Sequence, residues 1–310
     1  MKVGIVGAGL VGSAAGYALA LTGAINKVTF VDLNADLARA QADDISHAVP
    51  FVSNTIVESG AYKDLTDAAV VILAAGVNQK PEETRLELLE RNAEVFRSII
   101  DEVLTNAPHA ILLVASNPVD IMTDITIRLS KLPPNRVIGS GTILDTARFR
   151  NLVGKHLGIS PHSIHGYVLG EHGDSEVLSW STARAGSVDI NEFAAQIGAP
   201  ITDHVKQHID DSVRKAAYHI INGKGATWYG IGAGLARIIK AIAQDQQAVL
   251  SVSTMTPNVQ GIEDVALSLP RIIGANGVVG DLMPSLNEAE RKALAASARL
   301  LKETATNIEI

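Results

Sequence analysis

The stretch GAGLVG at residues 7–12 decides the fold, because it joins a short apolar run to an alanine-rich segment. Residues 2–6 have the composition of a buried strand, and residues 13–21 have that of a helix. In such a strand, turn and helix unit, closely spaced glycines permit a tight turn and let the helix pack close to its strand. The chain is therefore expected to open with the first βαβ unit of a parallel sheet.

The glycine spacing also predicts a ligand. Gly7 permits the turn, Gly9 lets the backbone approach a pyrophosphate, and Gly12 lets the helix pack closely, with the phosphates at its N-terminus. Residues 28–31 form a second expected strand that ends at Asp32, twenty positions beyond Gly12. A carboxylate there accepts hydrogen bonds from the ribose hydroxyls and repels a 2′-phosphate. We therefore expect NAD rather than NADP; a glycine-rich turn with an ordinary strand-end aspartate is the alternative.

Strands and helices alternate through the first half of the chain, which predicts a doubly wound parallel sheet. The expected strands are residues 55–59, 70–75, 111–114 and 137–140, and the expected helices are residues 36–48 and 86–106. The pattern changes near residues 141–145. Beyond it we expect helices over residues 201–221 and 225–243 and a last helix capped by Ser285 and Glu288. Antiparallel strands are expected over residues 248–255, 259–268 and 271–280, with a turn at Asn276-Gly277.

These patterns predict two domains with the active site in the cleft between them. We expect a Rossmann domain that binds NAD over residues 1–141, and an α+β substrate domain with antiparallel strands over residues 142–310.

Composition narrows the class of protein. The 310 residues are 47% hydrophobic, enough for a sizeable core. The 26 basic and 33 acidic residues give a net charge of −7 without a basic run, which argues against a nucleic-acid partner. The absence of cysteine excludes disulfides and thiolate metal sites. Neither an export signal nor an apolar stretch of membrane-spanning length is present, so we expect a soluble cytoplasmic protein without membrane contact.

Several polar residues suit acid–base chemistry. His172 ends an apolar run, and an imidazole can exchange a proton near neutral pH. Asp145 and Arg148 share one helix face, so the carboxylate can orient an imidazole while the guanidinium binds a substrate carboxylate. Arg85, in a polar loop after a strand, can bring a cation to a carbonyl, and the amide of Asn117 can bind substrate. The structural alternatives are a strand-end histidine, a surface ion pair, a solvated loop residue and a turn.

Taken together, the motifs GAGLVG, AAGVNQKPEETR, SNPVD, GTILDTARFR and GEHGDS, with the strand-end Asp32, resemble in order and along essentially the whole chain those of the lactate/malate dehydrogenase superfamily, and within it the bacterial L-lactate dehydrogenases. The resemblance implies that His172 is the catalytic proton donor and acceptor, with Asp145 as its orienting partner. It implies that Arg148 clamps the substrate carboxylate, that Arg85 polarises the ketone and that Asn117 helps to hold the substrate. It also places near the cofactor or substrate Val11, Gly76, Val77, Asn117, Ser140, Thr227 and Ile231.

Gln79 is the residue expected to choose the substrate. The malate enzymes of this superfamily carry arginine at that place, where it pairs with a second carboxylate, whereas neutral Gln79 leaves such a carboxylate uncompensated. A buried unpaired charge costs several kcal/mol, on the order of a thousandfold in selectivity, which favours pyruvate. Glu83 departs from the glycine usual in the lactate enzymes, which bears on how the loop closes.

Arg150 lies two residues beyond Arg148, so on a helix it points away from the substrate face. In the bacterial enzymes, an arginine and a histidine that match Arg150 and His165 bind fructose 1,6-bisphosphate between subunits, so the resemblance implies allosteric activation and a homotetramer. A surface arginine and a strand histidine are the alternative. No metal is expected, because His162, His165 and His172 lack a recognisable ligand spacing.

The sequence therefore predicts a cytoplasmic NAD-dependent oxidoreductase that interconverts pyruvate and L-lactate, as in the fermentation of glycolytic pyruvate. Two alternatives remain open: a malate dehydrogenase of the same superfamily, and an NAD-binding sensor without catalysis. The sensor gives no reason for His172, Asp145, Arg148 and Arg85 to occur together.

Overall fold

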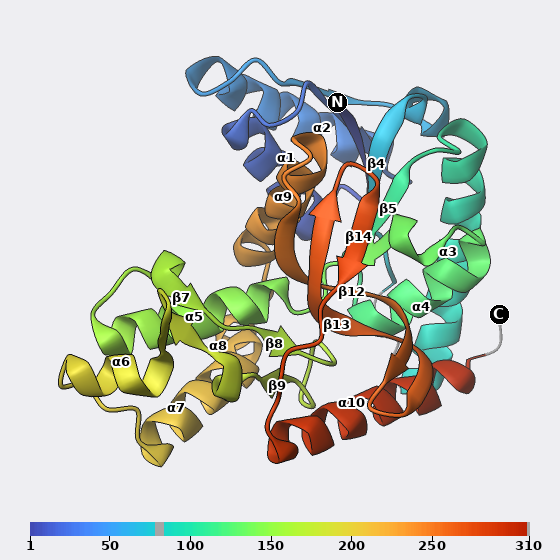
Figure 1. Ribbon diagram of the computed structural model, residues 1–310. Coiled ribbons are helices and arrows are strands. Elements are labelled where there is room, and N and C mark those ends of the chain that lie inside the picture. Colours follow the sequence, from blue (N-terminus) through green and yellow to red (C-terminus); the bar gives the residue numbers. More distant parts are fainter. Residues whose placement is uncertain (78–83, 309–310) are drawn as a thin grey trace.

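The computed structural model describes residues 1–77 and 84–308 (Figure 1). The first half forms, in chain order, β1 (Lys2–Val6), α1 (Leu10–Thr22), β2 (Lys27–Val31), α2 (Ala35–Ala48), β3 (Ile56–Ser59), β4 (Ala68–Leu73), α3 (Arg85–Asn106), β5 (Ile111–Val114), α4 (Val119–Ser130) and β6 (Val137–Gly139). The second half forms α5 (Ile143–Leu157), β7 (Ile164–His165), β8 (Val168–Leu169), β9 (Val177–Leu178), β10 (Arg184–Ala185), β11 (Val188–Asp189), α6 (Ile190–Gln196), α7 (Asp203–Arg214), α8 (Ala216–Lys224), α9 (Tyr229–Ala243), β12 (Ala248–Val259), β13 (Ile262–Gly274), β14 (Gly277–Asp281) and α10 (Glu288–Thr306).

Within the described ranges, the largest sheet has nine strands in the order β14-β13-β12-β6-β5-β4-β1-β2-β3. The six strands from β6 to β3 are parallel, which confirms the predicted doubly wound sheet. The winding reverses between β1 and β4, and ligands of such sheets bind in the crevice that this reversal opens at the carboxyl ends of the strands. The antiparallel strands β12, β13 and β14 extend the same sheet, because Ser253 of β12 pairs with Gly139 of β6.

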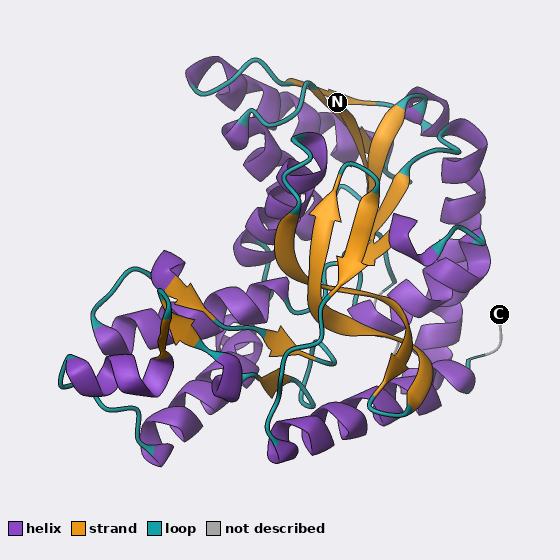
Figure 2. Ribbon diagram, in the orientation of Figure 1, coloured by secondary structure: helices purple, strands orange, loops and turns teal. Residues whose placement is uncertain are grey.

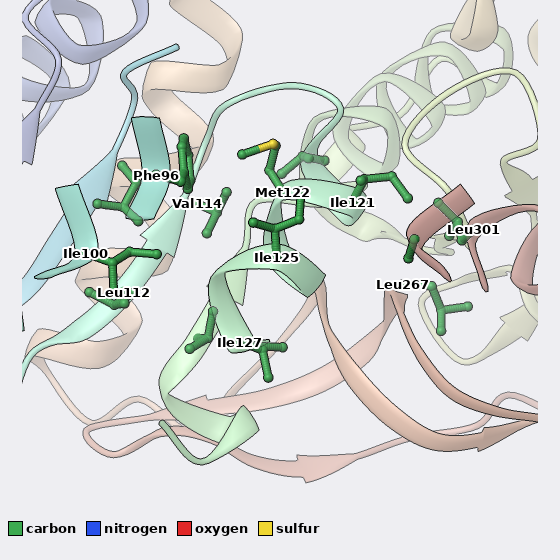
Figure 3. Close-up of a cluster of buried hydrophobic side chains, with 14 of the residues drawn as sticks. Phe96, Ile100, Leu112, Val114, Ile121, Met122, Ile125, Ile127, Leu267 and Leu301 are labelled. Atoms are coloured by element: carbon green, nitrogen blue, oxygen red, sulfur yellow. The ribbon is translucent and has the colours of Figure 1, made fainter. Parts of the chain in front are cut away.

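Helices cover both faces of this sheet (Figure 2). One buried cluster packs α1, α2 and α9 on one face, and another packs α3, α4 and α10 on the other. Figure 3 shows Met122 and Ile125 of α4 between Phe96 of α3 on one side and Leu267 of β13 and Leu301 of α10 on the other. Helix α4 is therefore packed against elements of both halves of the chain.

A smaller cluster lies around α5, α6 and α7 with the short strands β7, β10 and β11. This lobe stands to one side of the large sheet in Figure 1. No helix within the described ranges combines the length and the apolar composition needed to cross a bilayer.

Several expected boundaries in the second half are wrong. The helix expected over residues 201–221 is two helices, α7 and α8, which meet at Lys215. Strand β12 continues through Pro257, since the ladder pairs its neighbours on either side with β13, and the hairpin turns at Gln260-Gly261, both with positive φ. The next turn is Ala275-Asn276, one residue earlier than expected.

The start of the last helix also differs from the expectation. The N-cap of α10 is Asn287, whose side chain accepts from the backbone N–H of Glu290, and Glu290 bonds back to Asn287. The capping box expected at Ser285 and Glu288 is therefore displaced by two residues. Asn is as good an N-cap as Ser, so the two candidate boxes could not be ranked by propensity.

Candidate active site

The glycine loop between β1 and α1 is shaped by the protein's own packing at two of its three glycines. Gly7 has φ +105°, and a Cβ there would lie 2.6 Å from the backbone nitrogen of Ala75. A Cβ on Gly12 would lie 1.9 Å from the carbonyl oxygen of Gly7. A Cβ on Gly9 would meet nothing within 4 Å among the described residues. Gly9 is thus the glycine of this loop that faces open space, where a ligand can approach the backbone.

Asp32, at the end of β2, has a fixed carboxylate. Its Oδ2 accepts from the backbone N–H of Ala8 at 2.7 Å and its Oδ1 from that of Asn34 at 2.8 Å. Each oxygen keeps lone-pair capacity for a ribose hydroxyl. In the described part of the chain no side chain caps α1, and its first turn contains no acidic residue, so its terminal N–H groups suit a phosphate. These residues fit NAD.

Asp145 anchors two cationic groups at once. It lies in the first turn of α5 and is 2% exposed. Its Oδ2 lies 2.5 Å from Nδ1 of His172, and its Oδ1 accepts from Nη1 of Arg148 at 2.8 Å. Asp145 and Arg148 therefore form an ion pair, but one whose carboxylate is buried rather than the surface pair considered as the alternative, and the same carboxylate also orients the imidazole. With Nδ1 engaged, Nε2 of His172 is the nitrogen that remains for a substrate.

The loop that carries His172 is held by three distant elements. Gly170 and Ser268 of β13 exchange backbone hydrogen bonds at 2.9 and 3.0 Å, and the N–H of Glu171 donates to Oγ of Ser297 in α10. The N–H of His172 donates to Oδ2 of Asp120 in α4 at 2.7 Å. Sequence reasoning assigned no role to Asp120. The carboxylate stands in an otherwise largely apolar segment, which was a usable signal of a buried polar contact, and the structure shows it to be 2% exposed.

The electrostatics of the site favour a protonated imidazole. Burial lowers the pKa of His172, but the carboxylate of Asp145, through charge and hydrogen bond, and then the carboxylate of Asp120 outweigh that effect and raise the pKa to about 9. At neutral pH His172 is an imidazolium whose charge Asp145 balances. Such a group can donate a proton to an oxygen that develops negative charge.

Glu176 is a second acidic residue that sequence reasoning missed. It is 3% exposed, and its Oε1 accepts no hydrogen bond from any described residue. Burial, followed by the nearby carboxylate of Asp145, raises the pKa of Glu176 to about 8. Nothing in the sequence distinguishes this residue from the other acidic residues near His172.

The other residues expected at the cofactor follow neighbouring strands at one edge of the sheet. Gly76 and Val77 follow β4, and the N–H of Val77 donates to Oδ1 of Asn92, a buried α3 residue that sequence reasoning did not select. Asn117 follows β5 and is exposed, and Ser140 follows β6, where its N–H donates to the carbonyl of Val114. This is the edge at which doubly wound sheets bind ligands.

Val11 and Ile231 lie at the contact of α1 with α9. Both side chains are half-buried against the cluster that α1, α2 and α9 share. A Cβ on Gly232 of α9 would lie 2.7 Å from the carbonyl carbon of Ala14, which shows how closely the helices approach. Thr227 is half-buried and lies just before the N-terminal end of α9, the end that packs against α5.

Gln79 and the side chain of Arg85 lie outside the described residues, although α3 begins at Arg85.

Arg150 is turned away from Asp145, as the helix geometry predicts. Its Nε donates to the carbonyl of Gly166 at 2.9 Å, and its guanidinium carbon lies 4.8 Å from the centre of the Tyr167 ring. His165 is exposed in β7, next to Gly166 in sequence. Arg150 therefore contacts the segment 165–167 to which His165 belongs. Over the residues that the structure describes, no cluster of His, Asp and Glu is arranged to hold a metal ion.

A glycine loop that fits NAD, together with a proton donor and a guanidinium both held by the buried Asp145, defines an NAD-dependent oxidoreductase. The chain belongs to the lactate/malate dehydrogenase family: residues 1–139 match its NAD binding domain and residues 142–309 its alpha/beta C-terminal domain. Among curated proteins, the chain is 64% identical over 308 residues to the L-lactate dehydrogenase of Allorhizobium ampelinum and 58% identical over 306 residues to that of Thermus aquaticus, with 99% of each chain covered in both cases.

Solved structures agree with this placement. A minor L-lactate dehydrogenase from Enterococcus mundtii, crystallised with ligands, is 41% identical and matches with a TM-score of 0.95 over 100% of this chain and 98% of its own. A lactate dehydrogenase from a Medee basin deep-sea metagenome library matches with the same TM-score at 39% identity, over 98% of both chains.

Proposed function

We propose that this protein is an L-lactate dehydrogenase that interconverts pyruvate and L-lactate with NAD as cofactor. The observation that carries the proposal is the double engagement of Asp145, which holds His172 and Arg148 by its two oxygens. A proton donor and a carboxylate-binding guanidinium are thereby presented together, as reduction of a 2-oxo acid requires. Full-length identity of 64% to an L-lactate dehydrogenase supports the same substrate.

Each side chain has a distinct task in the proposed mechanism. Arg148 keeps one nitrogen on Asp145 and uses its other N–H groups to bind the substrate carboxylate. Protonated His172 donates from Nε2 to the ketone oxygen, and Asp145 stabilises the imidazolium before transfer. Arg85 polarises the carbonyl, and Asn117 and Thr227 help to hold the substrate. When bound, NADH supplies the hydride and NAD accepts it in the reverse direction.

We propose that the cofactor is bound by residues at the carboxyl edge of the sheet. Gly7, Gly9 and Gly12 shape the pyrophosphate site, and Asp32 accepts from the ribose hydroxyls. The remaining cofactor contacts are Val11, Gly76, Val77, Asn117 and Ser140. The proposed domains are residues 1–141 for NAD and residues 142–310 for substrate and catalysis.

Substrate choice is tested by NADH oxidation with pyruvate and with oxaloacetate. Faster turnover of pyruvate is expected, since Gln79 gives the second carboxylate of oxaloacetate no cationic partner. Gln79→Arg is expected to shift the preference toward oxaloacetate, and Gln79→Asn, which stays neutral, is the matched control. Preference of the wild-type protein for oxaloacetate would assign the chain to the malate branch, and inactivity on both substrates would support an NAD-binding sensor.

We also propose a homotetramer that fructose 1,6-bisphosphate activates through Arg150 and His165. Arg150 contacts Gly166 and Tyr167, the two residues that follow the exposed His165 in the chain, which supports a shared phosphate site. Arg150→Gln is expected to abolish stimulation by the bisphosphate, whereas Arg39→Gln, at an exposed arginine of α2, is expected to retain it. Light scattering during gel filtration tests the tetramer.

The proposed location is the cytoplasm, where the enzyme would ferment glycolytic pyruvate to lactate. The lack of cysteine supports this location, because it fits a reducing compartment. Fractionation of the source cells, with immunoblotting of the soluble and membrane fractions, tests it.

A further inference from the structure

Glu176 is a buried acid that the proposed mechanism does not use. Its side chain is almost completely excluded from water, yet none of the described residues donates a hydrogen bond to Oε1. A buried carboxylate oxygen ordinarily accepts a hydrogen bond that offsets its loss of hydration, and Oε1 lacks one. From this geometry we propose that Glu176 takes up a proton when the anionic 2-oxo acid binds, so that the substrate enters the site together with one additional proton. The inference rests on the proposed function.

The charged groups that face Glu176 come from three elements. Asp145 and Arg148 lie on α5, His172 lies on the loop between β8 and β9, and Arg214 ends α7. Arg214 is fixed in place because its Nη1 donates to the carbonyl of Asp174 at 2.8 Å. When His172 is protonated, the three cations are matched by three carboxylates: those of Asp145 and Glu176, and that of Asp120, which accepts from the backbone N–H of His172.

Substrate binding changes this balance. The carboxylate of a 2-oxo acid on Arg148 brings a fourth anion into the site, so that the anions outnumber the three cations. An ionised Glu176 then opposes binding, because like charges in a desolvated pocket repel strongly. Protonation of Glu176 removes the conflict at little cost, because burial and Asp145 already raise its pKa well above the ordinary value for a carboxyl group.

The role is one of positioning and charge balance. Glu176 need not touch the reacting atoms; it acts through Arg148 and His172. The effect therefore falls on substrate affinity and on its pH dependence more than on turnover at saturating substrate. By linkage, each group that must be protonated in the complex weakens binding roughly tenfold per pH unit above its own pKa in the free enzyme.

The test is calorimetric binding of oxamate, an isosteric analogue of pyruvate, to the NADH-loaded enzyme between neutral pH and about pH 10, in buffers of different ionisation enthalpy. For the wild-type protein the plot of log Kd against pH is expected to approach a slope of about two, from Glu176 and His172 together. For Glu176→Gln, whose amide is neutral throughout, a slope of about one is expected, with proton uptake near pH 8 lower by about half a proton.

Glu171→Gln is the matched control, because Glu171 lies in the same loop but its carboxylate accepts hydrogen bonds from Ser175. This variant is expected to keep the slope of the wild-type protein. Equal slopes and equal proton uptake in wild type and Glu176→Gln would overturn the inference.

Infrared difference spectra of the wild-type enzyme give a second test that does not depend on folding of a variant. Oxamate binding near pH 9 is expected to produce a carbonyl band of a protonated carboxyl group, and the lack of such a band would count against the inference. The proposed function is judged separately by pyruvate turnover of the wild-type protein. An enzyme that turns over pyruvate with a slope of one leaves that function standing and refutes only the role of Glu176.

Discussion

Asp120 accepts a hydrogen bond from the backbone N–H of His172 at 2.7 Å, although 52 positions separate the two residues in the chain. This bond fixes the main chain of His172, while Asp145 fixes its side chain. The imidazole is therefore positioned from α4 and from α5 independently, and these helices belong to different halves of the chain.

The first prediction concerns Asp120. In Asp120→Ala the N–H of His172 loses its buried acceptor, so the free energy of unfolding is expected to fall by about 1–3 kcal/mol and kcat/KM for pyruvate to fall with it. In Asp120→Asn the amide oxygen can still accept, so stability and kcat/KM are expected to stay closer to those of the wild-type protein. Denaturant unfolding and steady-state kinetics measure both effects, and equal losses in the two variants would contradict a hydrogen-bonding role.

The second prediction concerns the charge of Asp145. Because Asp145 is the main group that raises the pKa of His172 to about 9, Asp145→Asn is expected to lower that pKa. In the wild-type protein, the rate of pyruvate reduction should decline as pH rises through about 9, and the rate of lactate oxidation should increase over the same range. In the variant, the decline should begin at lower pH, and kcat/KM at neutral pH should fall by roughly 10²- to 5 × 10³-fold, since breaking a buried ion pair costs about 3–5 kcal/mol.

The same shift has a consequence for stability. The pKa of His172 is higher in the folded protein than its ordinary value, so the folded state binds the proton more tightly than the unfolded state. The resulting stabilisation is complete below the pKa that His172 has in the unfolded protein, and it is lost as pH rises through about 9, its pKa in the folded protein. Thermal unfolding of wild type and Asp145→Asn across this range provides the check, because the variant should show a smaller loss between neutral pH and pH 9. An identical pH dependence in both proteins would exclude His172 as the group responsible.

Sequence reasoning succeeded where one local pattern has one physical cause. The glycine spacing and Asp32 predicted the first βαβ unit because turn geometry, helix packing and a strand-end carboxylate must occur at fixed intervals. The i to i+3 spacing placed Asp145 and Arg148 on one helix face, as the structure confirms. The assignment of catalytic roles to particular residues, in contrast, came from resemblance to a family.

What the sequence could not provide depends on contacts between distant segments. The bond from His172 to Asp120 and the burial of Glu176 arise only when α4, α5 and the loop after β8 come together. Similarly, no local pattern indicates that β12 pairs with β6 and so joins the antiparallel strands to the parallel sheet. Local propensity also failed at the N-terminus of α10, where two adjacent cap sequences compete.

The third prediction separates the roles of two glycines. In Gly12→Ala the new methyl group would lie 1.9 Å from the carbonyl oxygen of Gly7, so the loop must shift and the protein is expected to lose stability. In Gly9→Ala the methyl group meets no described atom within 4 Å, so stability should change little. Its effect should appear in NADH affinity, because the methyl group occupies the space through which the pyrophosphate approaches the backbone. Thermal unfolding without cofactor and fluorescence titration with NADH distinguish the two, and unchanged NADH affinity in Gly9→Ala would contradict the proposed cofactor site.

The fourth prediction concerns Arg271, which lies fully buried in β13. Its guanidinium donates to the carbonyls of Val252, Thr254 and Leu267 and to the hydroxyl of Thr256, and it forms an ion pair with Asp281 of β14. One side chain therefore connects β12, β13 and β14 at the place where the antiparallel strands extend the parallel sheet.

Arg271→Ala removes all of these bonds and leaves several buried carbonyl groups without a donor. We expect a loss of about 3–5 kcal/mol in the free energy of unfolding. Asp281→Asn removes only the charge of a partner whose side chain is 43% exposed, so a loss of about 1 kcal/mol or less is expected. Urea unfolding at fixed protein concentration, followed by fluorescence of Trp180 and Trp228, compares the variants. If Asp281→Asn is as unstable as Arg271→Ala, the ion pair rather than the carbonyl network stabilises this part of the sheet.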